Sequence, residues 1–133
     1  MQCMYKPKLI IMNKAIELRN LVIRKTIENQ GCSINLNSEI PDKGFMVSLK
    51  GHELQVNILE FSLDHIDRFI DDNIKLLSNR KCFIGTWVEN DIVFIDVSIN
   101  LKNKRASLAF AQDNGQIAIF DVLQNKTVYL LNS

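Results

Sequence analysis

The sequence contains few of the residues that build disulfide-bonded or metal-bound small proteins. Its 133 residues include three cysteines and two histidines. Cys3, Cys32 and Cys82 are an odd number without a Cys-x-x-Cys pair, and His52 and His65 have no ligand at metal spacing. We therefore expect no metal and no cofactor, and the free cysteines indicate a reducing compartment.

Long hydrophobic runs, repeats and linkers are also missing. The longest early apolar run, Leu9 to Met12, is far too short for a signal-peptide core, and no run approaches the roughly 18 residues of a membrane span. A net charge of +1 gives no overall field for nucleic acid or an anionic membrane. We expect one cytoplasmic domain over residues 1–133 that does not enter a membrane. Residues 1–12 are expected to form a flexible tail or a weak strand.

Recognisable catalytic and nucleotide-binding motifs are absent as well. The chain has no Gly-x-Ser-x-Gly nucleophile turn, no Walker loop, no dinucleotide fingerprint and no RNA-binding aromatic pair. The sequence therefore nominates no catalytic residue.

What the chain does have is an ordinary globular composition. Hydrophobic residues make up 47 % and charged residues 23 %, which argues against a disordered chain. A chain of this length buries roughly two thirds of the surface that its unfolded form exposes. A packed core therefore needs no covalent or metal cross-link.

Apolar periodicity predicts three helices and several short strands. Residues 32–36 and 45–49 alternate as strands around a turn at Pro41 and Asp42, which predicts a hairpin. The expected helices are 13–29, 63–77 and 103–113, and the other expected strands are 54–58, 82–88, 92–99, 116–122 and 127–131.

From residue 45 onward, the order of these elements follows the split βαβ pattern of ferredoxin-like proteins. The predicted fold class is α+β, an antiparallel sheet with helices packed mainly on one face. An N-terminal helix and extra edge strands are added to the ferredoxin-like core. A one-sided sheet of unrelated topology is the alternative.

The strand at 92–99 presents two different faces. One is apolar throughout, whereas the other combines Phe94 with Asp96 and Ser98. This second face is expected to be open to water, or covered by the N-terminal helix or by a partner. Asp96 and Asp121 can act as an acid and base pair or bind a cation if they lie close together. Otherwise each accepts hydrogen bonds that fix the fold.

Trp87, the only tryptophan, lies near the end of the preceding strand. It can anchor a partner or cap the core. The candidate binding residues are Trp87, Phe94, Asp96, Ser98 and Asp121.

Charge is spread unevenly along the chain. Residues 1–36 carry six Lys or Arg against two Glu, and residues 37–72 carry three against eight acids. Glu60, Asp64, Asp67 and Asp71 form an acidic line that either meets a basic partner or is simply a solvated face. The opposite charge gathers at Lys102, Lys104 and Arg105, which indicates either phosphate contact or a soluble surface.

Four segments carry a resemblance to a known group of proteins. They are residues 44–49 (GFMVSL), 83–87 (FIGTW), 95–98 (IDVS) and 114–121 (NGQIAIFD). Together they resemble a small module encoded by bacteriophages and other mobile elements, over about residues 30–131. The resemblance implies a cytoplasmic accessory protein of bacterial or viral origin and assigns no catalytic residues.

Three functions follow from these observations. The first is a non-enzymatic interaction protein that binds a host or element-encoded macromolecule. We expect this partner to be another protein or a second copy of the chain. The second is a small enzyme or ligand-binding domain with a site around Asp96, Ser98 and Asp121. The third is nucleic-acid binding through Lys102, Lys104 and Arg105.

Overall fold

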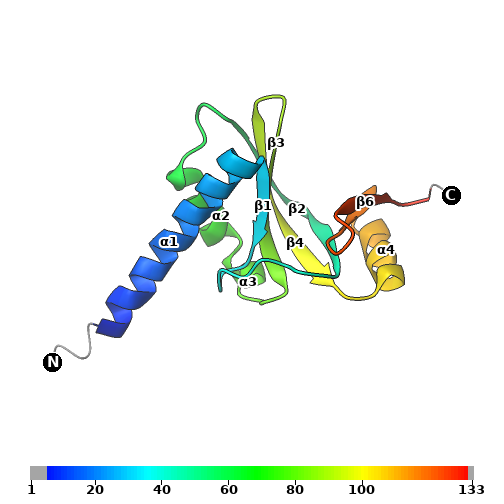
Figure 1. Cartoon of the computed structure of the whole chain (residues 1–133), viewed down its shortest axis with the longest axis horizontal. Coiled ribbons are helices and arrows are strands. Elements are labelled where there is room, and N and C mark those ends of the chain that lie inside the picture. Colours follow the sequence, from blue (N-terminus) through cyan, green and yellow to red (C-terminus); the bar gives the residue numbers. More distant parts are fainter. Residues whose placement is uncertain (1–5, 132–133) are drawn as a thin grey trace.

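A computed structural model describes residues 6–131, with side chains from residue 15 onward (Figure 1). This part of the chain forms a mixed structure of helices and strands. The helices are α1 (Lys6–Asn29), α2 (Leu63–Asp72), α3 (Ile74–Leu77) and α4 (Lys104–Asp113). The strands are β1 (Gly31–Ile34), β2 (Phe45–Asn57), β3 (Cys82–Glu89), β4 (Ile92–Leu101), β5 (Ala118–Asp121) and β6 (Lys126–Tyr129).

The six strands form one curled sheet in the order β1-β3-β4-β2-β5-β6. Every neighbouring pair is antiparallel. The α+β class and the antiparallel sheet expected from the sequence are therefore confirmed.

One face of this sheet is covered by helices. Alternation along β4 directs Val93, Ile95 and Val97 into a core that also holds Leu18 of α1 and Ile66 of α2. Helix α4 packs farther along the same face, in a smaller cluster with Val47, Ala111 and Ile119.

Helix α1 lies on this covered face together with α2, so it does not shield the opposite face of the sheet. A buried polar contact helps to fix it there. The hydroxyl oxygens of Thr26 on α1 and Thr86 on β3 lie 2.6 Å apart, and Thr26 Oγ1 also donates to the carbonyl of Val22. Both threonines are buried, so this contact satisfies hydroxyls that water does not reach.

The N-terminal helix is longer than the sequence indicated. It begins at Lys6 rather than near residue 13, so residues 6–12 are helical and not a tail or a strand. Proline is tolerated in the first turn of a helix because the amide it lacks has no partner there, which explains how Pro7 fits. Residues 1–5 lie outside the described part of the chain.

The predicted hairpin between residues 32–36 and 45–49 is wrong. Strand β1 pairs instead with β3, at the edge of the sheet, with Ile34 opposite Ile84. The intervening loop is organised by the buried Asn35. Its Oδ1 accepts the backbone amides of Asn37 (3.0 Å) and Glu39 (2.9 Å), and its Nδ2 donates to the carbonyl of Arg80 (3.1 Å).

Two further elements differ from their predicted bounds. The predicted strands at 45–49 and 54–58 are one strand, β2, whose pairing with β4 shifts register between Ser48 and Glu53. The predicted helix at 63–77 is divided at Asn73 into α2 and α3. Asn73 Nδ2 donates to the carbonyl of Phe69 (2.8 Å), a local bond that competes with the regular helix ladder.

Candidate functional site

The candidate site lies on the face of the sheet opposite the helices. Phe94, Asp96 and Ser98 project to this face from β4, because their neighbours Val93, Ile95 and Val97 project into the core. Pairing sets Trp87 opposite Phe94. The same register sets Gly85 opposite Asp96 and Ser48 opposite Ser98.

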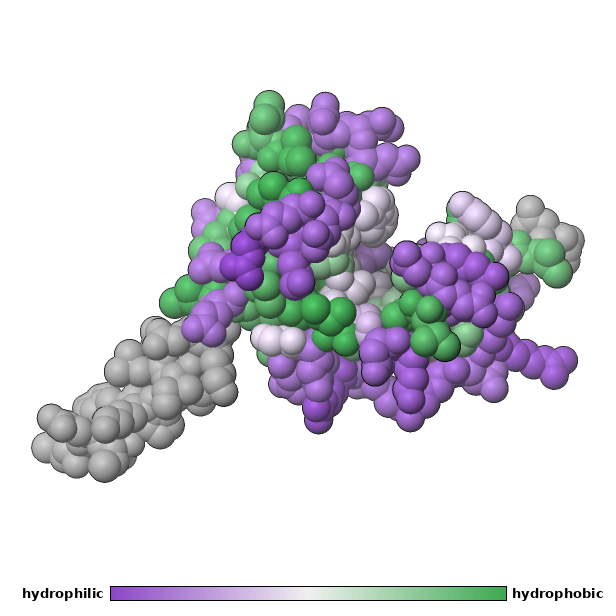
Figure 2. Space-filling view, viewed as in Figure 1, coloured by the Kyte–Doolittle hydropathy of each residue, from purple (hydrophilic) through white to green (hydrophobic). Residues whose placement is uncertain are grey.

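The curl of the sheet turns this face into a pocket of about 450 Å³. Figure 2 shows the molecule hollowed between the surface over β1 and the surface over α4 and β6. All six strands contribute lining residues, among them Ser33, Met46, Trp87, Asp96, Phe120 and Thr127. Asp96 is the only charged side chain among the residues that line it.

Asp96 lies in this pocket with only 3 % of its surface exposed. Its Oδ2 accepts a hydrogen bond from Ser48 Oγ (2.6 Å), and its Oδ1 accepts one from Ser98 Oγ (3.2 Å). Burial raises the pKa of this carboxyl, although the two hydroxyl donors act in the opposite direction. Glu53, its cross-strand neighbour, raises the pKa further through like charge.

Gly85 makes room for this carboxylate. A Cβ atom built at Gly85 would lie 2.3 Å from Oδ1 of Asp96, closer than any real side-chain contact allows. Glycine in a strand commonly marks such a close approach. The position of Asp96 thus depends on the missing side chain at residue 85.

An aromatic pair forms one wall beside Asp96. The rings of Trp87 and Phe94 stack with centroids 4.9 Å apart and planes 5° from parallel. Trp87 keeps 36 % of its surface exposed, and Phe120 on β5 keeps 37 %. Trp87 therefore sits on the open face and does not cap the main core.

Asp121 does not join Asp96. In β5 it shares a face with Ile119, on the covered side of the sheet, whereas Phe120 projects to the open face. Its Oδ1 accepts the backbone amide of Gln124 (3.1 Å) in the turn before β6. Of the two alternatives, a close pair of Asp96 and Asp121 is excluded, because alternation separates them onto opposite faces, and each carboxylate instead accepts its own hydrogen bonds. The two carboxylates therefore do not face one common site, as an acid and base pair would require.

The other members of the pocket were missed by sequence reasoning. Ser48 and Gly85 lie on predicted strands, yet their closeness to Asp96 depends on which strands pair and in what register. Ser48 precedes Asp96 by almost fifty residues, whereas Gly85 lies opposite it on the adjacent strand β3. The one signal in the sequence was glycine inside the apolar stretch 83–87, which indicates a close backbone approach.

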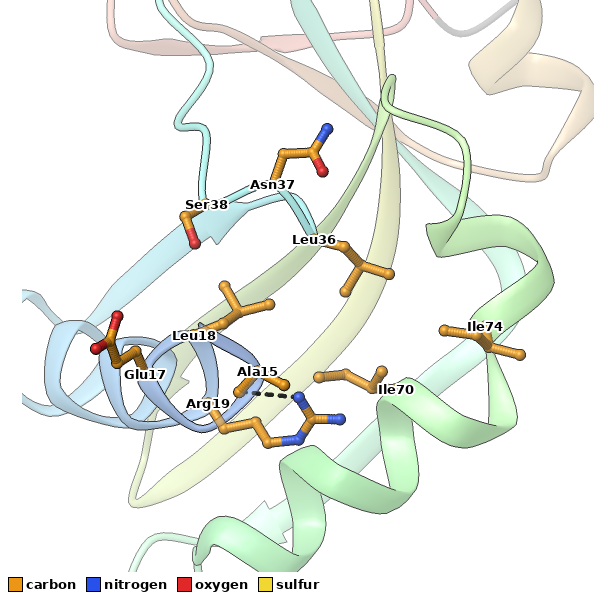
Figure 3. A pocket seen from close by; sticks show the side chains of 9 residues that line it. All are labelled: Ala15, Glu17, Leu18, Arg19, Leu36, Asn37, Ser38, Ile70 and Ile74. Atoms are coloured by element: carbon orange, nitrogen blue, oxygen red, sulfur yellow. Dashed lines mark hydrogen bonds between the residues drawn. The ribbon is translucent and has the colours of Figure 1, made fainter. Parts of the chain in front are cut away.

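A second hollow, of about 720 Å³, lies between α1, α2 and the loop after β1. In Figure 3 the apolar side chains of Leu18, Leu36 and Ile70 point toward one another, and Asn37 points away. The cation in this hollow, Arg19, donates to the carbonyl of Ala15 (2.9 Å) and forms an ion pair with Asp67. This hollow is a groove between packed helices, and the cation among its described lining residues already has partners within the chain.

The two histidines line a third hollow, between β2 and α2. A hydrogen bond of 2.7 Å joins His52 Nδ1 and Asn73 Oδ1, and His65 Nδ1 accepts the amide of Ser62 at the start of α2. These bonds give both rings structural roles. Among the residues with described side chains, no three His, Cys, Asp or Glu cluster as a metal site would require.

The charged patches predicted from the sequence are exposed, and their residues make different contacts. Asp67 is committed to the ion pair with Arg19, while Glu60, Asp64 and Asp71 face solvent. On the basic side, Lys104 and Arg105 are the first two residues of α4, and Asn103 caps that helix through Ala106 N (3.0 Å). Lys102 lies beside Asp121 in a separate hollow.

Comparison with known proteins identifies no relative of this chain. No protein-family model, no curated protein and no solved structure matches it. The resemblance to a phage or mobile-element module therefore stays a prediction. Within residues 6–131, no helix is long and apolar enough to cross a membrane.

Proposed function

We propose that this protein is a non-enzymatic binding protein whose open sheet face receives a partner protein. One observation carries the proposal: a pocket of about 450 Å³, holding a buried carboxylate among aromatic side chains, lies on the face that the helices leave uncovered. Four of the five candidate residues, Trp87, Phe94, Asp96 and Ser98, lie on this face.

The side chains on this face support a protein partner. The solvated face of an antiparallel sheet is normally polar, yet this one carries Met46, Trp87, Phe94 and Phe120. Aromatic residues and methionine are enriched in protein interfaces. The hydroxyls of Ser33 and Thr127, which also line the pocket, provide hydrogen-bonding groups for a partner's backbone.

Nucleic acid is less compatible with this face. Binding to a phosphate backbone requires cations, and the pocket lining contains an acid and no Lys or Arg. Lys104 and Arg105 belong to α4, which packs on the opposite face of the sheet. Binding through residues 102–105 therefore remains a separate prediction.

Site-specific photocrosslinking tests the proposal. We expect a photoreactive amino acid at Phe120, on the pocket rim, to give a discrete crosslinked protein in cells that express the native partner. The matched control is Leu59, which is 92 % exposed in the turn after β2. Equal crosslinking from both positions, or none from residue 120, would contradict the proposal.

We propose in addition that β2 to β5, with α2 and α4, form a ferredoxin-like core. The support is the order β3-β4-β2-β5 in the middle of the sheet and the position of the helices between β2 and β3 and between β4 and β5. A phage or mobile-element origin, a cytoplasmic location and homodimer formation remain predictions.

A further inference from the structure

Asp96 is a buried carboxyl group, and no cation among the described side chains pairs with it. The described side chains form two ion pairs, Arg19 with Asp67 and Arg80 with Glu39, and neither involves Asp96. Each oxygen of a carboxylate has about two acceptor sites. One hydroxyl on each oxygen therefore leaves capacity for further donors in the pocket.

Keeping this charge is unfavourable for folding. Removing a carboxylate from water without pairing it costs free energy, and the like charge of Glu53 adds to that cost. An amide of the same shape would accept from one serine through its oxygen, donate to the other through its nitrogen, and carry no charge. The carboxylate is thus poorly suited to a purely structural task.

The surroundings of Asp96 suit a cation. Trp87 and Phe120 expose aromatic surface at the same pocket, and aromatic faces attract Lys and Arg groups. Long basic side chains also bury their alkyl stems along apolar surface. The pocket therefore combines a negative group at its base with apolar walls.

We propose that the pocket binds a lysine or arginine side chain of the partner protein, with its cationic group against Asp96. This inference rests on the proposed function of the open face and adds the chemistry that the partner must supply. A charge-assisted hydrogen bond to a carboxylate is roughly twice as strong as a neutral one, which makes Asp96 the specificity determinant of the site.

Trp87 allows a direct test because it is the only tryptophan in the chain. The probe is N-acetyl-arginine amide, titrated into the full-length protein while Trp87 fluorescence is recorded, with N-acetyl-lysine amide as a second cation. The neutral isostere N-acetyl-citrulline amide serves as the ligand control. We expect a saturable change with one or both cations, and binding of citrulline weaker by about tenfold or more.

Two variant pairs locate the binding charge. Asp96→Asn is expected to weaken cation binding by about tenfold or more, whereas Asp71→Asn, at an exposed position on α2, is expected to leave it unchanged. Thr127→Lys places an ammonium group at the pocket rim and is expected to displace the probe, while Thr127→Gln is not. The lysine variant gives an answer even if Asp96→Asn does not fold.

Three outcomes would overturn the inference: no saturable signal with either cation, equal binding of citrulline, or full probe binding by folded Asp96→Asn or Thr127→Lys. Crosslinking at residue 120 separates this failure from that of the proposed function. A crosslinked partner without cation binding leaves the open face as a docking surface but overturns its proposed chemistry. Absence of both contradicts the two proposals together.

Discussion

At the scale of single residues, Gly85 and Asp96 depend on each other across β3 and β4. The carboxylate occupies the space where a side chain at residue 85 would lie. This pair explains why a glycine interrupts an otherwise large and apolar segment. It also means that the two positions should respond to substitution as a coupled unit.

Gly85→Ala is expected to destabilise the protein by about 1–3 kcal/mol, because the new Cβ overlaps Oδ1 of Asp96. In an Asp96→Ala background the same substitution should cost less than half as much. Urea unfolding of the four proteins in this double-mutant cycle measures the coupling. An equal cost in both backgrounds would show that the carboxylate is not what excludes a side chain at residue 85.

The raised pKa of Asp96 predicts how stability depends on pH. Between the unfolded value, near 3.9, and the higher folded value, the folded protein binds more protons than the unfolded chain. The free energy of unfolding contributed by this group therefore falls as pH rises through that interval.

We expect Asp96→Asn to become progressively more stable relative to the native chain as pH increases from about 3 toward 7. Urea unfolding of both proteins at each pH measures the difference. The comparison removes the opposite effect of Glu39, since Arg80 lowers the pKa of that carboxyl to about 2 in both proteins. A native chain that gains stability over the variant with rising pH would contradict the burial of an unpaired charge.

At the scale of elements, local patterns in the sequence predicted which face of a strand is buried. They did not predict which strands pair when the strands are far apart in the sequence. The alternation of Val93, Ile95 and Val97 predicted which face of β4 is core. Nothing in Cys32 to Leu36 indicated that β1 pairs with β3 instead of β2, because alternation identifies a face but not a neighbour. The same limitation concealed Ser48 as a partner of Asp96 and left open whether Asp121 lies near it.

The loop that carries the chain from β1 to β2 depends on Asn35. Asn35→Ala removes its hydrogen bonds to Asn37, Glu39 and Arg80 and leaves two amides and a carbonyl of the partly buried loop without this partner. We expect a loss of about 1–3 kcal/mol in the free energy of unfolding, measured by urea denaturation. The control Asn37→Ala, at an exposed site in the same loop, should change stability by less than about 0.5 kcal/mol. Equal effects would contradict the role of Asn35.

Helix α1 is joined to α2 by the ion pair between Arg19 and Asp67, and 54 % of the Asp67 side chain is exposed. Asp67→Asn should therefore cost only about 0.2–1 kcal/mol, with most of the difference lost in 1 M salt. Asp71→Asn, one turn away on the same helix, is the control without this partner. Unfolding in urea at low and high salt measures both, and a salt-independent loss at residue 67 would argue against an ionic contact.

At the scale of the whole molecule, the helices with described side chains gather on one face of the sheet and leave the other hollow. The covered face supplies the core through residues from α1, α2, α3 and α4. The open face contributes little to that core, yet it holds a buried carboxylate and exposed aromatic side chains. This division between a stabilising face and a binding face is the central claim.

The most direct test combines stability and binding in one variant. Asp96→Asn, with the photocrosslinker at residue 120, is expected to melt at or above the temperature of the native chain at pH 7. The same variant should lose about tenfold or more of the crosslinked product. A variant that melts well below the native chain would show that Asp96 is structural. An undiminished yield of crosslinked partner would show that binding does not depend on it.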